Sequence, residues 1–362
     1  MIKAAINGFG RIGRQAFKIA LEHDDIEIVA INDLSNARAL AYLLKYDSPY
    51  GEFDYSLGVK EGKDEISLDD ELTPIDFGYK TESTDVSLMV NGKEVKVFAE
   101  KDPTNLPWKN LGVDVVLECT GFFTKDGTAR THIQAGAKRV VVSAPTKGGD
   151  VMTFLRGVNH DAYDKNDVIS NASCTTNCIT PVARIIENAF GIEKAMLTTI
   201  HATTATQNLV DGLPSGGKTD DMRRGRSAYV NIVPTSTGAA KASKDVIPSL
   251  GDRFDGIAVR VPVITGSLSD LTFLLKKDVT VEEVNAAFIT ASEDPYYEGV
   301  LRVTYDPIVS SDIIGDPHSS IVDLSATMVV AGNLLKVLAW YDNEWGYSNR
   351  LVEMAIEVGK TA

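Results

Sequence analysis

Residues 3–13 read KAAINGFGRIG, and the fold is predicted most directly from this stretch. A short apolar run leads straight into Gly8-x-Gly10-x-x-Gly13, and residues 14–22 continue with apolar side chains at helical spacing. Glycines punctuate many turns, so the motif alone says little. A strand before it and a helix after it are the context that the dinucleotide-binding fingerprint requires. We therefore predict a β-α-β unit that holds a dinucleotide.

The second strand of this unit, residues 27–32, ends on Asp33. The acid follows the last glycine by about 20 residues, the spacing expected for a carboxylate that binds the adenine ribose. Gly8 and Gly10 let backbone N–H groups approach a pyrophosphate at the helix N-terminus. A 2′-phosphate would meet the like charge of Asp33, so NAD is favoured over NADP. A purely structural role for the glycines is the alternative.

Two further buried runs, residues 114–121 and 139–145, read as parallel strands that end in turns. In a doubly wound sheet the carboxyl ends of the strands face the ligand crevice. Thr120, Gly121 and Ser143 are therefore predicted to point toward the dinucleotide. Cys119 falls inside the first of these runs, where a cysteine is typical core packing.

The region between these strands combines a hairpin signal with an acidic segment. Asn91-Gly92 joins two β-like runs, 87–90 and 95–98, which favours a two-residue hairpin turn. Residues 52–85 are acidic and rich in turn-forming residues, and we interpret them as a solvated excursion rather than a site. Residues 35–44 read as a helix.

Composition limits the classes of protein that need to be considered. A length of 362 residues predicts two domains. The net charge of −14 argues against a general nucleic-acid binder or a protein of anionic membrane surfaces. Three cysteines make no disulfide framework and favour a reducing compartment. Met1 runs directly into a strand, with no leader pattern, and no apolar run is long enough to span a membrane. These features favour the cytoplasm.

The second half of the chain has a different character. Four long β-like runs, several rich in threonine, alternate with helical patterns such as 281–291; they are 195–201, 258–263, 269–275 and 334–340. They predict a mixed or antiparallel sheet that is open on one face. The expected fold class is thus α/β, a Rossmann-type doubly wound parallel sheet plus a second, α+β domain. A long loop, 211–226, carries Arg223, Arg224 and Arg226, which suit solvent, an anion or a subunit contact.

The stretch Ser173-Cys174-Thr175-Thr176-Asn177-Cys178 opens a helical pattern. Ser173 is a plausible N-cap, and Pro181 is expected in the first turn, where proline is tolerated. Cys174 would then lie among the free N–H groups of the helix start, which stabilise a thiolate and lower its pKa. Both cysteines are equally compatible with simple packing, so the six residues alone leave nucleophile and packing open.

His201 ends one of the predicted strands before a threonine-rich turn. A lone histidine is more often structural than catalytic, and a Cys–His pair requires a contact in space that the sequence does not show. Zinc is the rival partner for Cys174, Cys178 and His201. A structural zinc site needs four ligands, and the sequence holds no second cysteine pair, so no metal is predicted.

Four motifs in order resemble phosphorylating glyceraldehyde-3-phosphate dehydrogenases, nearly end to end. They are NGFGRIGR at 7–14, ASCTTNC at 172–178, PTSTGAAK at 234–241 and WYDNEWGYS at 340–348. The resemblance implies a homotetramer and a two-domain chain. Residues 1–173 would form the NAD-binding Rossmann domain, 174–340 the catalytic domain, and a last helix within 341–362 would pack back onto the first domain.

The resemblance also assigns roles. Cys174 is expected as the thiol nucleophile and His201 as its base. Thr204 and Arg260 match the ligands of the substrate phosphate, with Arg223 close by. The inorganic-phosphate site is expected at Ser173, Thr175, Thr237 and Gly238. NAD contacts are expected at Asn7, Gly8, Gly10, Arg11, Ile12, Asp33, Lys101, Thr120, Ser143 and Asn343.

The resemblance implies oxidation of glyceraldehyde 3-phosphate to an acyl phosphate through a thioester on Cys174. Three features depart from the family. They are an insertion within 60–85, a longer loop at 211–226, and Thr206 where other members carry aspartate. The longer loop leaves open whether Arg223 or Arg224 faces the anion site. Two other interpretations remain. Erythrose-4-phosphate dehydrogenase shares the thiol and the histidine, and a non-catalytic dinucleotide-binding regulatory protein would use the cysteines only structurally.

Overall fold

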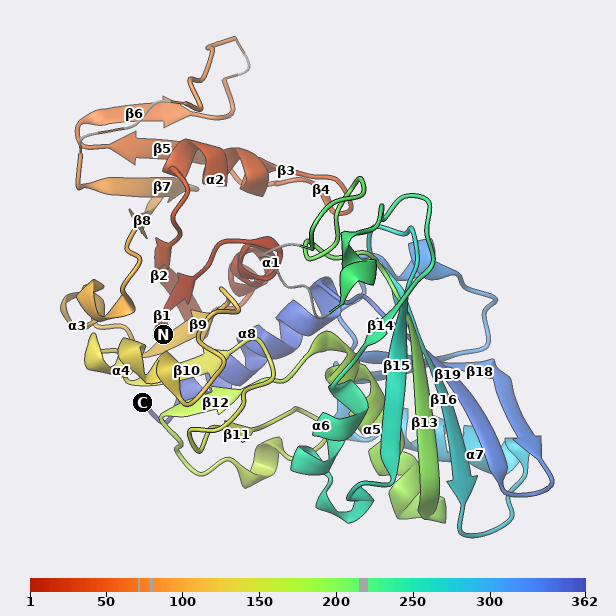
Figure 1. The fold of residues 1–362 in the computed structure, drawn as a ribbon. Coiled ribbons are helices and arrows are strands. Elements are labelled where there is room, and N and C mark those ends of the chain that lie inside the picture. Colours follow the sequence, from red (N-terminus) through yellow and green to blue (C-terminus); the bar gives the residue numbers. More distant parts are fainter. Residues whose placement is uncertain (71, 79–80, 82, 215–220) are drawn as a thin grey trace. The chain divides into compact units, whose positions relative to one another are not determined.

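The computed structural model describes residues 1–70, 72–78, 81, 83–214 and 221–362 (Figure 1). These residues divide into two compact units. The first comprises Met1–Met152, Asp164–Asn171 and Leu351–Ala362. The second comprises Thr153–Tyr163 and Ala172–Arg350.

A ten-stranded sheet organises the first unit. Its order is β11 (Met152–Thr153), β12 (Val168–Ser170), β10 (Arg139–Val142), β9 (Val115–Glu118), β1 (Ile2–Asn7), β2 (Ile26–Asn32), β8 (Lys93–Phe98), β7 (Val86–Val90), β5 (Leu57–Glu61) and β6 (Asp64–Ser67). The strands from β12 to β8 pair in parallel. The pairs β8–β7, β7–β5 and β5–β6 are antiparallel. The predicted Rossmann-type parallel sheet is confirmed, with an antiparallel extension at one edge.

The β-α-β unit at the start of the chain is confirmed. The helix α1 (Arg11–Ala20) begins three residues earlier than predicted because the turn is short. Gly8 has φ +94°, and a Cβ there would lie 2.8 Å from the amide nitrogen of Thr120. A Cβ on Gly13 would lie 2.1 Å from the carbonyl oxygen of Gly8. Both positions therefore require glycine, one for conformation and both for space.

The hairpin between β7 and β8 is also confirmed. Asn91 and Gly92 both have positive φ, 48° and 73°, as a type I′ turn requires. The interpretation of residues 52–85 as a solvated excursion was wrong in part. Its strands β5 and β6 extend the sheet, because Leu57 and Val59 bury their side chains against it. Residues 71, 79, 80 and 82 of the expected insertion lie outside the described residues.

The remaining elements of the first unit are short. They are α2 (Ala37–Lys45), α3 (Trp108–Leu111), α4 (Thr131–Gln134), the two-residue strands β3 (Tyr46–Asp47) and β4 (Gly51–Glu52), and the 3₁₀ turns η1 (Pro103–Asn105) and η2 (Thr128–Arg130). The helix α8 (Trp345–Gly359) crosses the limit between the units at Leu351.

A seven-stranded sheet organises the second unit. Its order is β14 (Val233–Ser236), β15 (Phe254–Arg260), β13 (Ile192–His201), β16 (Ser267–Leu275), β19 (Leu334–Tyr341), β18 (Ser320–Val330) and β17 (Leu301–Thr304). β13 pairs in parallel with β15 and β17 with β18, whereas the other pairs are antiparallel. The predicted mixed sheet is confirmed. Short 3₁₀ turns complete the unit: η3 (His160–Ala162), η5 (Met222–Gly225), η6 (Pro248–Leu250), η7 (Pro295–Tyr297) and η8 (Ser310–Ile313).

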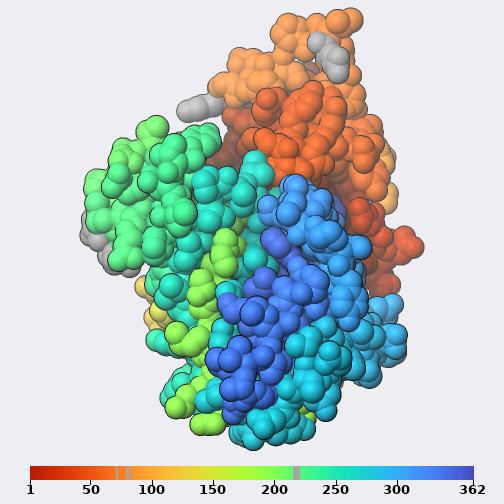
Figure 2. All heavy atoms as spheres, turned by 90° about the vertical axis from the view of Figure 1, so that its right-hand side faces the viewer, coloured from red at the N-terminus to blue at the C-terminus, as the bar shows by residue number. Residues whose placement is uncertain are grey.

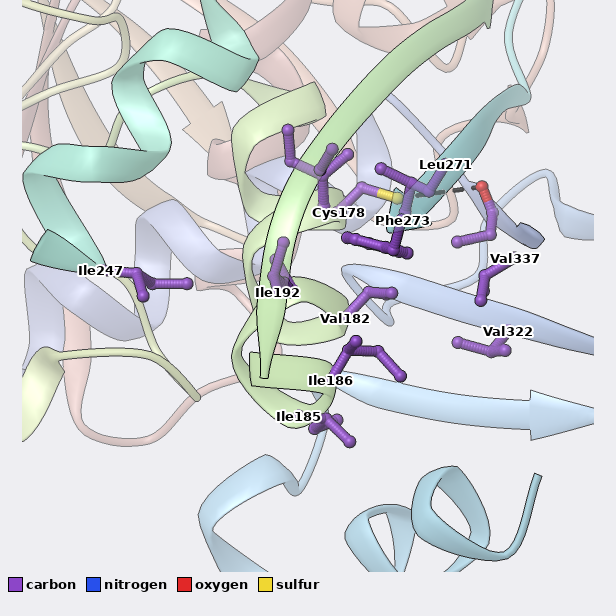
Figure 3. Packing of buried hydrophobic residues seen from close by; sticks show 14 of the residues in the cluster. Cys178, Val182, Ile185, Ile186, Ile192, Ile247, Leu271, Phe273, Val322 and Val337 are labelled. Atoms are coloured by element: carbon purple, nitrogen blue, oxygen red, sulfur yellow. Dashed lines mark hydrogen bonds between the residues drawn. The ribbon is translucent and has the colours of Figure 1, made fainter. Parts of the chain in front are cut away.

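Helices α5 (Cys174–Phe190), α6 (Ala239–Val246) and α7 (Val281–Ser292) pack on one face of this sheet. Val182 and Ile186 of α5 lie with Phe273 of β16 in the core between them (Figure 3). The other face carries exposed apolar side chains, namely Met196, Ile257, Met328, Val330 and Leu334. Figure 2 views this face, where β13, in lime, reaches the surface. The alternation along β16, buried then half-buried, produces these two faces.

The helix α5 begins at Cys174, as predicted, and Ser173 caps it. The backbone N–H of Thr176 donates to Ser173 Oγ at 3.1 Å. The expected place of Pro181 was wrong, because it lies in the third turn, where it has no N–H to donate to the carbonyl of Asn177. Thr180 next to it donates its hydroxyl to the carbonyl of Thr176 at 2.8 Å. No helix among the described residues is long and apolar enough to cross a membrane.

Candidate active site

The fold brings Cys174 and His201 together. Cys174 is the first residue of α5 and His201 the last residue of β13, and the sulfur lies 3.5 Å from Nε2 of the imidazole. The chain enters α5 through Ala172, whose φ of +51° is rare for a residue with a Cβ. Such a conformation costs about 1–2 kcal/mol. The turn at Ala172, which leads into Cys174 near the end of β13, therefore lowers the stability of the fold slightly.

The hydrogen bond that Nδ1 of His201 makes determines whether Nε2 can accept a proton from Cys174. Nδ1 lies 2.8 Å from the carbonyl oxygen of Ala202. If Nδ1–H donates to this carbonyl, Nε2 keeps its lone pair toward Cys174 and can accept the thiol proton. Arg260 donates to the same carbonyl at 3.1 Å and also contacts Nδ1. With Nδ1–H donating to Ala202, the contact of Arg260 with Nδ1 is not a hydrogen bond, because both groups are then donors, and Nε2 keeps its lone pair.

Burial sets the protonation of both groups. The pKa of His201 is lowered to about 3 by burial and by the charge of Arg260, so the imidazole is neutral. Burial raises the pKa of the Cys174 thiol, and the charge of Arg260 and hydrogen bonds with Thr175 offset this only in part. The expectation of a lowered Cys174 pKa was wrong, because desolvation of the thiolate outweighs the helix N-terminus here. The resting pair is a neutral thiol beside a neutral imidazole.

Tyr341 is a site residue that the sequence motifs contained but did not single out. Its buried hydroxyl lies 2.8 Å from that of Thr175 in α5 and 2.8 Å from that of Thr199 in β13. Its ring meets the His201 ring edge to face at 5.9 Å. Tyr341 thus links the helix that carries the thiol to the strand that carries the histidine. The alternation of β19, which turns every second residue inward, is the signal that could have found it.

Cys178 lies one helical turn after Cys174 and is buried in the core. Its thiol is fully buried and lies 3.6 Å from the hydroxyl of Ser269. Figure 3 shows Cys178 among the apolar side chains of this core. Burial raises its pKa to about 12, so it remains a thiol. Within the described part of the chain, no three histidine, cysteine or acidic side chains gather as a metal site would require. The open question of nucleophile or packing therefore resolves differently for the two cysteines: Cys178 packs, and Cys174 faces a histidine.

Cations stand next to this pair. Arg260 ends β15 directly beside His201 in the parallel register. The charge of Arg224 acts on Arg260 and contributes to lowering its pKa, after burial. Arg224 donates to the hydroxyl of Thr235, whereas Arg223 donates to the carbonyl of Pro234 and is exposed. Arg224, rather than the expected Arg223, is the arginine that is electrostatically coupled to Arg260. Residues 215–220 of this loop lie outside the described residues.

The hydroxyl groups expected at the anion sites are partly engaged. Ser173 Oγ holds Thr176, and Thr175 Oγ1 pairs with Tyr341. Thr204 Oγ1 lies 2.8 Å from the hydroxyl of Thr206. Thr237 Oγ1 accepts from the backbone of Ala239, and Gly238 is the N-cap of α6 without a capping side chain. Ser173 precedes α5, Thr237 and Gly238 precede α6, and these two helices pack against each other.

A cavity of about 550 Å³ lies at the carboxyl ends of the parallel strands in the first unit. Six of the expected NAD contacts line it, namely Asn7, Gly8, Gly10, Asp33, Lys101 and Thr120. A Cβ on Gly10 would meet no atom within 4 Å, and no side chain caps α1 there, so the helix N-terminus is open to an anion. These residues fit a dinucleotide with its pyrophosphate at Gly8 to Gly10.

Asp33 is held in place by its neighbours. Its carboxylate accepts from the backbone N–H of Phe9 at 2.9 Å and from that of Ser35 at 2.9 Å. Each carboxylate oxygen has a further lone pair, which suits two ribose hydroxyls. The glycine turn and the acid that binds the ribose are therefore parts of one hydrogen-bonded structure.

Four other expected NAD contacts are not part of this lining. Arg11 makes an ion pair with the buried Asp47 at 2.7 Å. Ile12 and Ser143 belong to the same unit but line neither this cavity nor a larger one nearby. Asn343 lies in the second unit, where its side chain accepts from Ser267 at 2.8 Å. The larger cavity, about 840 Å³, shares Leu34 and Glu100 but contains none of the glycines of the fingerprint.

The interpretation of Cys119 as a residue within a strand was wrong. β9 ends at Glu118, and Cys119 follows it in the lining of the 550 Å³ cavity. Burial and the charge of Glu118 raise the pKa of Cys119 to about 12, so it is a neutral thiol. The buried run is shorter than predicted because Thr120 folds back onto the carboxylate of Glu118.

Comparisons with known proteins match most of the chain to one family. Residues 2–75 and 68–126 match the family model described as glyceraldehyde 3-phosphate dehydrogenase, NAD binding domain, and residues 173–343 match its C-terminal domain. Glyceraldehyde-3-phosphate dehydrogenase of Streptomyces coelicolor is 49% identical over 99% of this chain and 98% of its own. That of Clostridium acetobutylicum is 49% identical over the whole of both chains. That of Salmonella typhimurium is 47% identical over 99% of each.

Proposed function

The chain belongs to the glyceraldehyde-3-phosphate dehydrogenase family, and on this premise we propose that it oxidises D-glyceraldehyde 3-phosphate with NAD and inorganic phosphate. The product is 1,3-bisphosphoglycerate, and the pathway is glycolysis. The observation that carries the proposal is the 3.5 Å contact between Cys174 Sγ and His201 Nε2 at the start of α5. A thiol and a neutral imidazole at this distance form a nucleophile with its base.

The first step joins Cys174 to the aldehyde. His201 Nε2 takes the thiol proton while the sulfur bonds to the aldehyde carbon. The developing oxyanion receives this proton back from His201, and backbone N–H groups at the start of α5 stabilise the negative charge. The result is a hemithioacetal on Cys174, with His201 again neutral, as its lowered pKa favours.

The second step is the oxidation. When bound, NAD would supply the acceptor for the hydride that leaves the hemithioacetal carbon. The residue of this chain that acts in the oxidation is His201. Its Nε2 removes the hydroxyl proton of the hemithioacetal, and a thioester on Cys174 remains. Inorganic phosphate then attacks the thioester carbon, and the Cys174 sulfur leaves. The acyl phosphate is released, and the thiol regains its proton from His201.

Two phosphate groups must be held near one sulfur in this reaction. We assign Arg260 and Thr204 to the phosphate of the aldehyde, and Ser173, Thr175, Thr237 and Gly238 to inorganic phosphate. Arg224 is a better second cation than Arg223, because its charge is coupled to Arg260. Guanidinium groups bind phosphate through two N–H groups at once, which suits this role in an otherwise acidic protein.

We assign NAD to the cavity lined by Gly8, Gly10 and Asp33, with Asn7, Lys101 and Thr120 around it. Arg11, Ile12, Ser143 and Asn343 remain proposed contacts. Residues 1–173 are assigned as the NAD-binding domain, with a last helix within 341–362, and residues 174–340 as the catalytic domain. The two compact units support this division, since the cavity belongs to one and the Cys174–His201 pair to the other.

We further propose a homotetramer in the cytoplasm. The outer face of the seven-stranded sheet exposes Met196, Ile257 and Met328, among other apolar residues, and such a patch favours contact with a second copy. All three cysteines are free, which suits a reducing compartment. Replacing Met196 with Glu should lower the mass measured by light scattering. An unchanged mass would place the subunit contact elsewhere.

The function is tested by NADH formation from glyceraldehyde 3-phosphate with and without inorganic phosphate. The proposal predicts steady turnover with phosphate and a single burst without it. Equal or faster turnover of erythrose 4-phosphate would assign the sibling activity. NAD binding without a burst would indicate a non-catalytic dinucleotide-binding protein.

A further inference from the structure

A buried carboxylate lies behind the dinucleotide cavity, and the reaction does not use it. Glu118 ends β9 and is 1% exposed. Its neighbours in the network, His132 and Trp108, are fully buried. We infer that Glu118 is the positioning residue of the cofactor cavity: its single charge holds three segments of the lining in the geometry that binds NAD. This inference rests on the proposed placement of NAD in that cavity.

Four donors converge on the two oxygens of Glu118. Asn7 Nδ2 donates to Oε2 at 2.6 Å, and His132 Nε2 lies 3.0 Å from the same oxygen. The backbone N–H of Thr120 donates to Oε1 at 2.8 Å, and the Thr120 hydroxyl donates to Oε1 as well. Asn7 and Thr120 both line the cavity. The carboxylate therefore fixes the orientation of two cavity side chains directly.

Trp108 determines how His132 takes part. The indole Nε1–H has no acceptor capacity, so at 3.1 Å it donates to Nδ1 of His132. Nδ1 must then be without a proton, and Nε2–H is left to donate to Glu118. All four groups around Glu118 are thus donors, which only an ionised carboxylate satisfies with both oxygens. Trp108 keeps the neutral histidine in the tautomer that faces the carboxylate.

The network reaches a third segment of the lining through amide side chains. Asn7 Oδ1 accepts from Asn32 Nδ2 at 2.7 Å. The Asn32 amide closes a ring with the backbone of Glu100, donating to its carbonyl at 2.9 Å and accepting from its N–H at 2.8 Å. Glu100 and Lys101 also line the cavity. The ends of β1 and β9 and the turn after β8 are therefore connected to one charge.

The experiment compares NAD binding by calorimetry, without substrate, in the full-length wild type and in Glu118→Gln. The substitution keeps size and shape but places an NH₂ group against one pair of donors. We expect the dissociation constant for NAD to rise about tenfold or more, because hydrogen bonds to a buried charge are lost. Alkylation of Cys174 by iodoacetamide, measured without NAD, should keep its rate. Asp114→Asn is the matched control, since Asp114 immediately precedes the same strand at its opposite end and binds Lys3 and Lys138. This control should lower the melting temperature and leave NAD affinity within about twofold.

A double-mutant cycle separates positioning from general loss of stability. If Glu118 acts through Thr120, the variant Glu118→Gln with Thr120→Val binds NAD no more weakly than the weaker single variant. Full additivity of the two effects, or wild-type affinity in Glu118→Gln, would overturn the inference. If Glu118→Gln does not fold, Trp108→Phe decides: about threefold weaker binding supports the inference, and unchanged affinity contradicts it.

Asp33→Ala is measured in parallel, because it tests the placement of NAD rather than the role of Glu118. Weaker binding in Asp33→Ala together with unchanged binding in Glu118→Gln would leave the placement intact and reject the positioning role. Unchanged binding in both would show that NAD lies elsewhere, and the inference would fall with the placement.

Discussion

The ring of His201 meets the ring of Tyr341 edge to face, with centroids 5.9 Å apart and planes at 81°. Tyr341 in turn joins Thr175 of α5 and Thr199 of β13 through its hydroxyl. The histidine is thus fixed on one side by a ring and on the other by the carbonyl of Ala202. This support keeps Nε2 directed at the sulfur of Cys174.

Replacing Tyr341 with Phe keeps the ring and removes only the hydroxyl. Two buried threonine hydroxyls lose a partner, so we expect the free energy of unfolding to fall by about 1–3 kcal/mol. We also expect kcat to fall about tenfold, because the helix and strand that carry the pair are no longer linked. Denaturant unfolding and steady-state kinetics check both. Unchanged kcat with lower stability would reduce Tyr341 to a core residue.

His201 should make stability depend on pH. Its pKa is lowered to about 3 in the folded chain from an ordinary value near 6.5, so the unfolded chain binds more protons between these values. The contribution of neutral His201 to the free energy of unfolding is on the order of a few kcal/mol. It is present above about pH 6.5 and is lost as the pH falls toward 3. Comparing the wild type with His201→Asn by denaturant unfolding isolates it. A difference in unfolding free energy that stays constant from pH 7 to pH 4 would contradict the burial of a neutral imidazole.

Arg260 is predicted to bind the phosphate of the substrate. Arg260→Leu should raise KM for glyceraldehyde 3-phosphate and lower kcat, because a charge-assisted contact worth about 1.5–3 kcal/mol is lost. The expected loss in kcat/KM is roughly ten- to a hundredfold. NAD affinity should barely change, since the cavity belongs to the other unit. Lower stability with normal kinetics would make Arg260 a structural residue and move the substrate pocket.

Asp33 is predicted to select NAD. Asp33→Ala should weaken NAD binding and relax the discrimination against NADP, because one carboxylate both accepts the ribose hydroxyls and repels a 2′-phosphate. Kinetics with each cofactor in both proteins measure the effect. Comparable efficiency of the wild type with NAD and NADP would mean that Asp33 does not face the ribose.

Local signals predicted local structure well. The glycine turn, the Asn91-Gly92 hairpin and the Ser173 cap depend on nearby residues, and all three were confirmed. The third-turn position of Pro181 was missed because the packing of α5 outweighs the lost hydrogen bond. The buried strand β5 was missed because it lies within an acidic segment, and pairing with β6 and β7 rather than local sequence determines its structure.

Properties that depend on contacts in space could not be read from the sequence. The approach of His201 to Cys174 follows from how β13 packs beside α5. The raised pKa of Cys174 follows from burial, which only the fold determines. The electrostatic interaction of Arg224 with Arg260 depends on how the loop 211–226 is placed, and the length of this loop does not predict which arginine comes near Arg260. The family resemblance placed these residues in one site, and the geometry of the pair needed the structure.

The most direct test of the whole account is the pre-steady-state burst of NADH in Cys174→Ser beside Cys178→Ser. Cys174 faces His201, whereas Cys178 lies in the core with a pKa of about 12. We predict that Cys174→Ser abolishes the burst while NAD binding persists, and that Cys178→Ser retains a burst near one equivalent per chain with modestly lower stability. A normal burst in Cys174→Ser, or equal loss in both variants, would contradict the assignment of Cys174 as the nucleophile.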